Sequence, residues 1–489
     1  MASGTIDRNA LVAEFRSFLG ADAVLDDAEE LKPYECDGLT AYRQIPLLVV
    51  LPETIEQVQR VLRVCTDRQV PVVARGAGTG LSGGALPLAD GVLLVLAKFN
   101  SILSIDTGNR TARVQPGVRN LAISEAVDAY GLYYAPDPSS QIACSIGGNV
   151  AENAGGLHCL KYGLTVHNIL ALEVLTMDGE RLTIGAQSLD AAGYDLLALL
   201  TGSEGLLAII VEITVRLLPK PECARVLLAA FDDVGAAGSA VGRIIAEGII
   251  PAGLEMMDNA AVRAAEDFVH AGYPTDAAAI LLCELDGTDG EVADRLEQVT
   301  ALLEDCHATE VRVARDDEER ARFWAGRKAA FPAVGRLSPD YYCMDGTIPR
   351  RELSRVLTRT AELSEEYGLR VVNVFHAGDG NLHPLILYDA NRDGELERVE
   401  KLGAKILELC VEVGGTITGE HGVGIEKIDQ MCVQFTAAEL QHFHAVKSAF
   451  DQHTLLNPGK AVPTLTRCAE LGGMHVHGGQ LPFPDLERF

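Results

Sequence analysis

Residues 75–84, RGAGTGLSGG, are the most informative stretch of this 489-residue chain. They follow the apolar strand candidate VPVVA and hold five glycines among small and polar residues. Such a loop can cradle a pyrophosphate with successive backbone N–H groups. Gly78, Gly80 and Gly83 also satisfy the dinucleotide pattern GxGxxG, but that pattern requires a helix directly after the loop. Here Pro87 and the strand-like GVLLVLAKF follow, so we predict a phosphate-binding loop between two strands, with a plain glycine-rich turn as the alternative.

Two further segments of the same kind follow, residues 136–163 (PDPSSQIACSIGGNVAENAGGLHCLKYG) and 201–210 (TGSEGLLAII). The amides of Asn149 and Asn153 can both donate and accept hydrogen bonds, and several serines add hydroxyl groups. Each segment alone is compatible with ordinary loop architecture. Three such segments in one part of the chain predict a single extended ligand that lies across them.

The composition excludes several classes of protein. Hydrophobic residues make up 48% of the chain, enough for large cores. The 69 acidic residues outnumber the 41 basic ones, and a formal net charge of -28 would repel nucleic acid. The N-terminus lacks a signal-peptide pattern, and the apolar stretches are shorter than the roughly 20 residues that a bilayer crossing needs. We therefore expect a cytoplasmic protein with no direct membrane insertion.

Eleven cysteines are scattered through the chain without a CxxC pair. This pattern encodes neither a zinc ribbon nor an iron–sulfur centre. An odd number of cysteines in a chain without a signal peptide predicts reduced, mostly buried thiols.

Apolar periodicity and punctuation by Gly and Pro divide the chain into four parts. Residues 1–41 form an N-terminal cap with a helix in ALVAEFRSFL, and residues 42–221 form the glycine-rich domain. Residues 222–463 repeat strand and helix, as in RVLLAAF and AAGSAVGRIIAEG, which predicts an antiparallel sheet with helices on one face. Residues 464–489 form a tail, either a flexible terminus or a contact with a partner. The fold class is α+β.

A candidate metal site lies in the second half of the chain. VVNVFHAGDGNLHPLIL places His376 and His383 at the ends of a glycine-rich turn between strands, and GGTITGEHGVG adds Glu420 and His421. Two histidines and one carboxylate are a common set of ligands for a divalent metal that keeps open positions for water or substrate. A hydrogen-bonded structural pair of histidines is the alternative.

These motifs resemble those of a known family. RGAGTGLSGG, PSSQIACSIGGNVAENAGG and GSEGLLAII resemble the flavin-binding motifs of the vanillyl-alcohol oxidase (PCMH) type FAD-binding domain. The part after residue 221 is similar to the FAD-linked oxidase C-terminal domain of D-lactate, D-2-hydroxyglutarate and glycolate dehydrogenases. YECDGLTAYR, RFWAGRKAAFPAVGR and SPDYYCMDGTIPRR resemble the FAD subunits of bacterial glycolate oxidases. The resemblance implies an FAD-binding domain of two α+β subdomains followed by the oxidase domain.

The resemblance also assigns the site residues. A divalent metal, zinc or a similar ion, would bind His376, His383 and Glu420, and His421 is our candidate for the base. Arg327 would bind the substrate carboxylate, with Asn381 beside it; a surface arginine on a helix is the alternative for Arg327. FAD would be noncovalent, because the loop 75–84 has no histidine. The residues expected to contact FAD are Arg75, Gly76, Ala77, Gly78, Thr79, Gly80, Leu81, Ser82, Pro136, Asp137, Ser140, Gly147, Gly148, Asn149, Asn153, Gly155, Glu204, Gly205, Ile210 and Asn457.

The implied reaction is the oxidation of a small 2-hydroxy acid, glycolate to glyoxylate and also D-lactate to pyruvate. A hydride would pass to flavin N5 while a base takes the hydroxyl proton and the metal holds the hydroxyl. Hydroxyglutarate enzymes carry a lysine for a second carboxylate where this chain has Cys343, which favours a small substrate. Glycolate and D-lactate differ by one methyl group and are not separated by the sequence.

Electrons must leave through a partner, since the chain shows no iron–sulfur or haem motif. The resemblance implies a complex with a second FAD-type subunit and an iron–sulfur subunit that passes electrons to the respiratory chain. The chain would then associate peripherally with the inner membrane through these subunits. The alternatives are a D-lactate dehydrogenase that works alone, a noncatalytic flavin subunit that relays electrons and, more distantly, a hydrolytic metalloenzyme.

Overall fold

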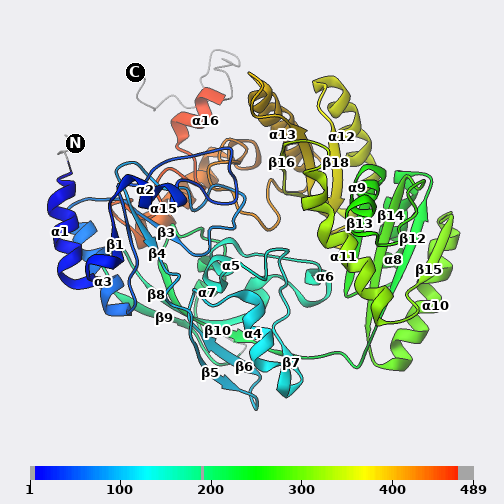
Figure 1. Cartoon of the computed structure of the whole chain (residues 1–489), viewed down its shortest axis with the longest axis horizontal. Helices are drawn as coiled ribbons and strands as arrows, with labels where there is room; N and C mark the ends of the chain where they lie inside the picture. The colour runs from blue at the N-terminus through cyan, green and yellow to red at the C-terminus, as the bar shows by residue number, and fades with distance from the viewer. Residues whose placement is uncertain (1–5, 189–191, 472–489) are drawn as a thin grey trace.

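The computed structural model describes residues 6–188 and 192–471, so most of the predicted tail lies outside the described residues. Figure 1 shows two halves side by side. The first half holds two sheets, and the second half holds one large sheet that helices surround. Short 3₁₀ helices occur at Ala21–Ala23, Lys32–Tyr34, Asp128–Tyr130, Thr165–His167 and Arg350–Glu352.

The first sheet has the strand order β1-β2-β4-β3, and β4 runs parallel to both of its neighbours. Its elements are α1 (Arg8–Leu19), β1 (Val24–Leu25), α2 (Ala28–Leu31), β2 (Leu48–Val50), α3 (Ile55–Asp67), β3 (Val72–Arg75) and β4 (Val92–Val95). The helix expected in ALVAEFRSFL is present as α1. Alternate strand residues face α1 and α3 on one side, and Leu31 packs on the other.

The second sheet is antiparallel, with the order β5-β6-β10-β8-β9. Its elements are β5 (Ile102–Asp106), β6 (Thr111–Val114), α4 (Asn120–Val127), α5 (Ile146–Glu152), α6 (Cys159–Tyr162), β8 (Ile169–Leu175), β9 (Arg181–Gly185), α7 (Leu196–Leu200) and β10 (Ile209–Arg216). A separate pair, β7 (Leu132–Tyr133) and β11 (Leu218–Pro219), precedes the second half. The predicted two α+β subdomains are therefore confirmed.

The second half is built on a seven-stranded antiparallel sheet with the order β15-β12-β14-β13-β18-β20-β16. Its strands are β12 (Cys223–Phe231), β13 (Gly253–Asp258), β14 (Ala279–Gly287), β15 (Glu310–Val313), β16 (Asp340–Cys343), β18 (Val371–Phe375) and β20 (Pro384–Tyr388). A small pair, β17 (Gly346–Thr347) and β19 (Asn381–Leu382), lies beside it. The helices are α8 (Val234–Ala246), α9 (Asn259–Val269), α10 (Asp289–Asp305), α11 (Asp317–Val334), α12 (Leu353–Tyr367) and α13 (Glu395–Glu412).

The prediction of helices on one face of this sheet is wrong, because helices cover both faces. Leu227, Ala229 and Phe231 of β12 pack with α8, α10 and α12, whereas Val226, Leu228 and Ala230 pack with α9 and α11. A strand that is buried on both sides needs a continuous apolar run rather than an alternating one. RVLLAAF is such a run.

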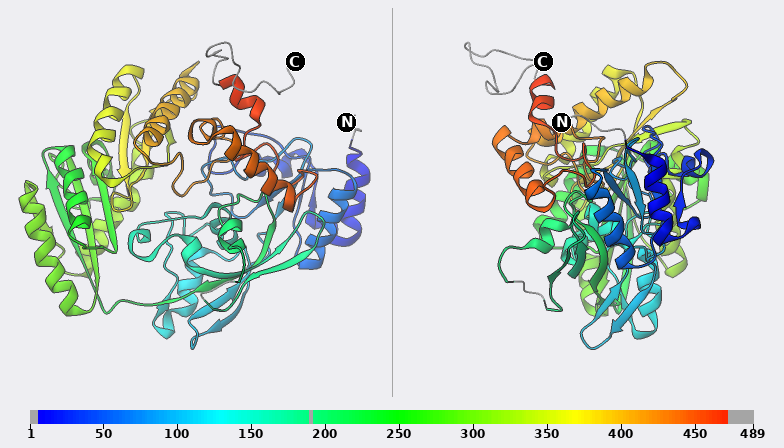
Figure 2. Two further views of the ribbon diagram at one scale, coloured as in Figure 1. Left: turned by 180° about the vertical axis from the view of Figure 1, so that it is seen from behind. Right: turned by 90° about the vertical axis from the view of Figure 1, so that its left-hand side faces the viewer.

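The chain then returns to the first half. After α14 (Met431–Gln434), helix α15 (Ala437–Phe450) lies against the second sheet, as both views in Figure 2 show. The segment beyond it forms backbone hydrogen bonds with β3, from Val72 N to Leu455 O and from Asn457 N to Val72 O, each 2.8 Å. Helix α16 (Leu465–Leu471) ends the described part of the chain.

The prediction that all cysteines are reduced is wrong for two of them. Cys432 and Cys468 form a disulfide, because α16 folds back beside α14 and brings their Cα atoms to 5.3 Å, within bridging range. The other nine cysteines are free, and seven of these are buried.

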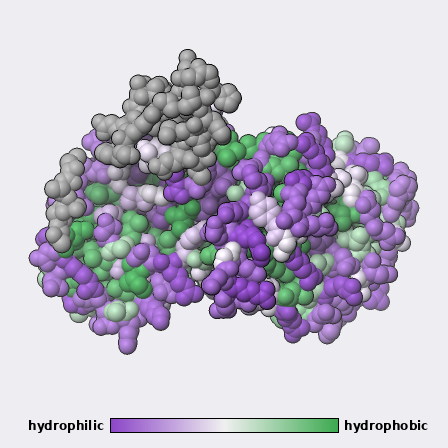
Figure 3. All heavy atoms as spheres, turned by 90° about the horizontal axis from the view of Figure 1, so that it is seen from above, coloured by the Kyte–Doolittle hydropathy of each residue, from purple (hydrophilic) through white to green (hydrophobic). Residues whose placement is uncertain are grey.

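Among the helices of residues 6–188 and 192–471, none combines the length and apolar character required to cross a membrane. The face of the molecule seen in Figure 3 is mainly hydrophilic over both halves.

Candidate active site

One cavity of about 420 Å³ connects the two halves of the molecule. All three glycine-rich segments of the first half line it. Arg327, His383, Glu420 and His421 line it from the second half. The three glycine-rich segments and four of the predicted site residues therefore line the same cavity.

The loop 75–84 begins where β3 ends at Arg75, and the next regular element is β4, so no helix follows the loop. This confirms that the GxGxxG pattern here is not the helix-opening kind. Gly78 and Gly83 have φ angles of +71° and +75°, which side-chain-bearing residues rarely adopt. A Cβ atom on Gly76 would lie 2.1 Å from the Ser145 hydroxyl oxygen, so the first two glycine-rich segments pack too closely for any side chain there.

Most of the predicted flavin contacts line the cavity: Arg75, Gly76, Ala77, Gly78, Thr79, Gly80, Leu81, Ser140, Gly147, Gly148, Asn149, Glu204, Gly205 and Ile210. Ser82, Pro136, Asp137, Asn153, Gly155 and Asn457 are not among its lining residues. Asn457 instead donates hydrogen bonds to Gly84 O at 3.0 Å and to Glu204 O at 2.8 Å. Asn457 therefore links the first and third glycine-rich segments without being one of the lining residues of the cavity.

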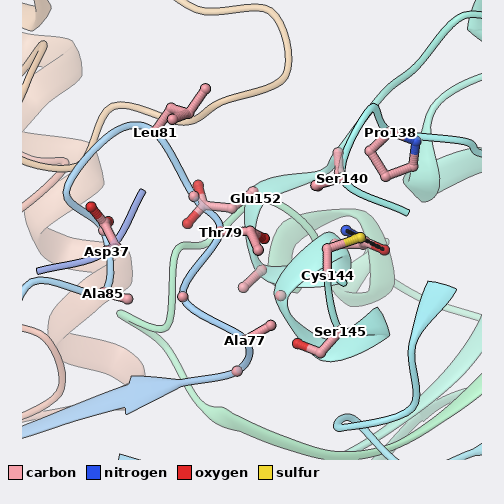
Figure 4. A pocket seen from close by; sticks show the side chains of 18 of the residues that line it. Asp37, Ala77, Thr79, Leu81, Ala85, Pro138, Ser140, Cys144, Ser145 and Glu152 are labelled. Atoms are coloured by element: carbon pink, nitrogen blue, oxygen red, sulfur yellow. Dashed lines mark hydrogen bonds between the residues drawn. The ribbon is translucent and has the colours of Figure 1, made fainter. Parts of the chain in front are cut away.

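The sequence reasoning missed two acidic residues of the cavity, Asp37 and Glu152. Figure 4 shows both beside the loop that carries Thr79, with Ser140 and Ser145 across the cavity. Burial raises the pKa of Asp37, and burial together with the Glu204 charge raises the pKa of Glu152 well above its usual range. Asp37 stands in YECDGLTAYR and Glu152 three residues after Asn149, but nothing in either motif shows that it faces the cavity.

The predicted metal ligands meet as expected. His376 directly follows β18, His383 directly precedes β20, and their ring centroids lie 5.1 Å apart. Glu420 Oε1 lies 3.2 Å from His376 Nε2 and 2.8 Å from His383 Nε2. Burial raises the pKa of Glu420, but the two histidines lower it more, so the pKa falls well below the usual range. One ligand atom from each of the three residues lies within 4.8 Å of the other two, an arrangement that fits a divalent cation.

A buried carboxylate lies behind His376, one of the predicted metal ligands. Glu255 of β13 accepts the Nδ1 hydrogen of His376, with distances of 2.8 and 3.0 Å to its two oxygens. The same carboxylate pairs with Arg327, at 2.9 Å from Nε and 2.7 Å from Nη2. Burial raises the pKa of Glu255, but the His376 and Arg327 charges lower it below its usual value. Sequence reasoning missed this residue.

His421 lies flat against His383, with ring centroids 5.0 Å apart and planes 15° apart. Burial lowers the pKa of His421 to about 4, so its imidazole is neutral at neutral pH. Among the described residues its buried Nδ1 has no hydrogen-bond partner. The neutral ring thus has one nitrogen without a hydrogen-bond partner in the described part of the chain.

A second buried carboxylate, Asp345, shapes the turn that carries Glu420 and His421. It accepts hydrogen bonds from the backbone N–H groups of Gly419, Glu420 and His421 at 2.9, 3.1 and 3.0 Å. Lys427, equally buried, donates to it at 3.0 Å. The turn therefore surrounds the Asp345 carboxylate, whose negative charge is balanced by Lys427.

Arg327 lies on α11 with 1% of its surface exposed, so the alternative of a surface arginine is wrong. Glu255 occupies its Nε side, and Arg327 also lines the cavity. Lys328 lines the cavity too, although it is an exposed residue. Asn381 is buried against Gly419 and is not among the lining residues; its role as a substrate ligand stays a prediction.

Two of the glycine-rich segments contact the turn that carries Glu420 and His421. A Cβ atom on Gly155 would lie 2.7 Å from Glu420 Oε2. Glu204 of the third glycine-rich segment accepts the N–H groups of Val423 and Gly424, both at 2.7 Å.

Comparison with known proteins agrees with this geometry. Residues 46–185 match the family model "FAD binding domain", and residues 220–461 match "FAD linked oxidases, C-terminal domain". The chain is 67% identical to the glycolate oxidase subunit GlcD of Escherichia coli K12 over 99% of this chain and 97% of that protein. It is 41% identical to the subunit of that name from Bacillus subtilis, over 87% and 91%, and 34% identical to a D-lactate dehydrogenase of Anaerostipes hadrus, over 85% and 89%.

Solved structures show the fold. A p-cresol methylhydroxylase superposes with a TM-score of 0.79 at 19% identity, covering 94% of this chain and 97% of that one. An alkyldihydroxyacetonephosphate synthase superposes with a TM-score of 0.73 at 18% identity, covering 92% and 86%.

From the two family models and the 67% and 41% identical relatives, the chain belongs to the FAD-linked oxidase family, the family of the glycolate oxidase subunit GlcD, and is an FAD-dependent oxidoreductase.

Proposed function

We propose that this protein oxidises a small 2-hydroxy acid at FAD, glycolate to glyoxylate and also D-lactate to pyruvate. The observation that carries the proposal is the shared cavity. It brings the flavin segments, a buried arginine, two convergent ligands of a metal set and a neutral histidine into one space. The names of the relatives, glycolate oxidase subunit and D-lactate dehydrogenase, support the same substrate class.

Arg327 binds the carboxylate of the substrate in this proposal. Its guanidinium is held on the Nε side by Glu255, which leaves the other edge for a carboxylate in the cavity. A guanidinium matches a carboxylate with two parallel hydrogen bonds. This contact fixes one end of a two-carbon acid and turns its C–OH toward the Glu420 side.

His376, His383 and Glu420 hold a divalent metal, for which we propose zinc. The donors fit, because two imidazole nitrogens and one carboxylate oxygen converge and the His376 ring is oriented by Glu255. A carboxylate behind a ligating histidine is the usual arrangement in metal sites.

His421 accepts the hydroxyl proton. It lies beside His383 at the cavity wall, and it is neutral at neutral pH. A metal held by His376, His383 and Glu420 would supply Lewis acidity that lowers the pKa of the substrate hydroxyl, and noncovalent FAD would supply the hydride acceptor. Asp345 keeps the base in place by holding its backbone N–H.

Electrons leave through partners in this proposal, a second FAD-type subunit and an iron–sulfur subunit, which would also bring the chain to the inner membrane. We retain the limits 1–41, 42–221, 222–463 and 464–489 as the proposed domains. The term "subunit" in the name of the Escherichia coli relative supports an assembly.

Anaerobic mixing of the purified flavoprotein with a panel of 2-hydroxy acids tests the function through the loss of flavin colour. We expect glycolate and D-lactate to bleach the flavin, and a His421→Ala variant to lose at least about a hundredfold in rate, the usual worth of a general base. Full bleaching by His421→Ala would support a relay subunit instead. Bleaching by D-lactate alone, with full turnover by the isolated chain, would support a stand-alone D-lactate dehydrogenase.

A further inference from the structure

His383 belongs to two sets of possible metal ligands rather than one. The first set is His376, His383 and Glu420, and the second is Cys343, His383 and His421. In each set, one ligand atom from every residue lies within 4.8 Å of the other two. The proposed reaction gives no role to Cys343.

The two ring nitrogens of His383 have different neighbours. Its Nε2 lies 2.8 Å from Glu420 of the first set. Its Nδ1 lies 3.4 Å from the carbonyl oxygen of Met344, and the Cys343 Sγ points at that same oxygen, also at 3.4 Å. Cys343, the last residue of β16, and Nδ1 of His383 therefore share the Met344 carbonyl oxygen as a neighbour.

His421 closes the second set. Its ring is stacked on His383, and its Nδ1 is buried without a hydrogen-bond partner in the described part of the chain. The Cys343 thiol and the His383 ring are buried, His421 is half-buried, and the buried Nδ1 of His421 has no hydrogen-bond partner among the described residues. Cys343, His383 and His421 together therefore form a possible set of metal ligands.

The two sets differ in the metals that they favour. A carboxylate suits harder cations, whereas a thiolate with two imidazoles favours zinc, cadmium and other thiophilic ions. The thiol exchanges its proton for the metal, so binding releases one proton to solvent. No electron transfer is involved.

We propose that Cys343, His383 and His421 form a second, overlapping metal site that takes a thiophilic divalent cation and inhibits the enzyme. A cation bound there occupies the nitrogen lone pair of His421, so the ring cannot accept the hydroxyl proton. The site itself follows from the geometry alone, and only its inhibitory effect rests on the proposed function.

X-ray absorption at the zinc edge tests the site without any assay of activity. Flavoprotein with excess zinc should show a sulfur neighbour at about 2.3 Å, the usual Zn–S distance. Cys343→Ala and Cys343→Ser should lose this neighbour. Cys65→Ala, which removes a buried thiol from the core of the first sheet, should retain it. A sulfur signal of equal size in both Cys343 variants, or none in the parent protein, overturns the proposal.

Flavin bleaching by glycolate tests the inhibition. Cadmium should inhibit the parent and Cys65→Ala, and either Cys343 variant, measured against its own uninhibited rate, should need at least about ten times more cadmium. Equal sensitivity in all variants overturns the inhibitory role. If no variant is bleached by glycolate, the proposed function has failed, while the sulfur signal still decides whether the site exists.

Discussion

Glu255→Gln removes the one negative charge that serves both the metal set and the substrate clamp. The carboxylate is 1% exposed and receives hydrogen bonds from His376 Nδ1 and from Arg327. Glutamine keeps the size of the side chain. Its amide nitrogen, however, cannot accept a hydrogen bond, so it would face one of the two donors, His376 or Arg327, with its own N–H hydrogens. Breaking a buried ion pair by removing one partner costs about 3–5 kcal/mol, and loss of the carboxylate behind a ligating histidine lowers metal affinity by about 10 to 100 times.

We therefore expect Glu255→Gln to bind zinc about 10 to 100 times more weakly, equal to about 1.4–2.8 kcal/mol, and to require more glycolate for half saturation. FAD should remain bound, because the carboxylate of Glu255 is bonded to His376 and Arg327, which both belong to the second half. Zinc affinity is measured by competition with a chelator, and the free energy of unfolding by urea denaturation.

Glu284→Gln is the matched control. Glu284 is a second buried glutamate of the same sheet, and it pairs with Arg320 and His158 rather than with a metal ligand. It should lose stability but keep its zinc affinity. An equal loss of zinc affinity in both variants would refute the reasoning, because the loss would then be a general effect of burying an amide in this sheet.

Three further predictions concern the clamp, the metal and pH. Arg327→Lys should raise the KM for glycolate at least about tenfold through loss of the paired hydrogen bonds, whereas Arg320→Lys on the same helix should not; equal increases in steady-state assays would point to the helix instead of the clamp. Chelation should abolish bleaching by glycolate, reversibly on adding zinc, while FAD stays on the protein after gel filtration; joint release of FAD would contradict separate sites. Burial lowers the pKa of His158, but Asp137 and Glu284 raise it to about 10. Because the folded pKa is raised, this stabilisation is complete below pH about 6.5 and fades toward pH 10, so His158→Gln should cost at least about 2 kcal/mol in urea at pH 6 and much less near pH 10.

The glycine loops could be predicted because their chemistry is local. A loop with Gly78 and Gly83 at positive φ needs glycine at those positions whatever surrounds it. The turn with His376 and His383 was predictable for a similar reason, since a seven-residue spacing between two strands brings both rings to one hairpin end.

The supporting carboxylates could not be placed, because their partners are far away in sequence. Glu255 lies 121 residues from His376, and Asp345 lies 76 residues from His421. A signal was nevertheless present for Glu255 and Glu284, because each lies inside a strand with an apolar residue on either side (LEM and CEL). A charge that is buried on both faces of a sheet must find a partner, so such strands predict a buried ion pair without naming it.

The turn that carries the base is held from both halves of the molecule, which explains why neither half carries the site alone. Asp345 accepts the N–H of His421 from the second half, and Glu204 accepts the N–H groups of Val423 and Gly424 from the flavin half. Glu204 is itself tied to the loop 75–84 through Asn457. A shift of the flavin segments therefore moves the proposed base with them, because Glu204 is bonded to the turn through its carboxylate and to Asn457 through its backbone carbonyl oxygen. This linkage fixes the distance between the flavin segments and His421 through hydrogen bonds rather than through a flexible docking of two domains.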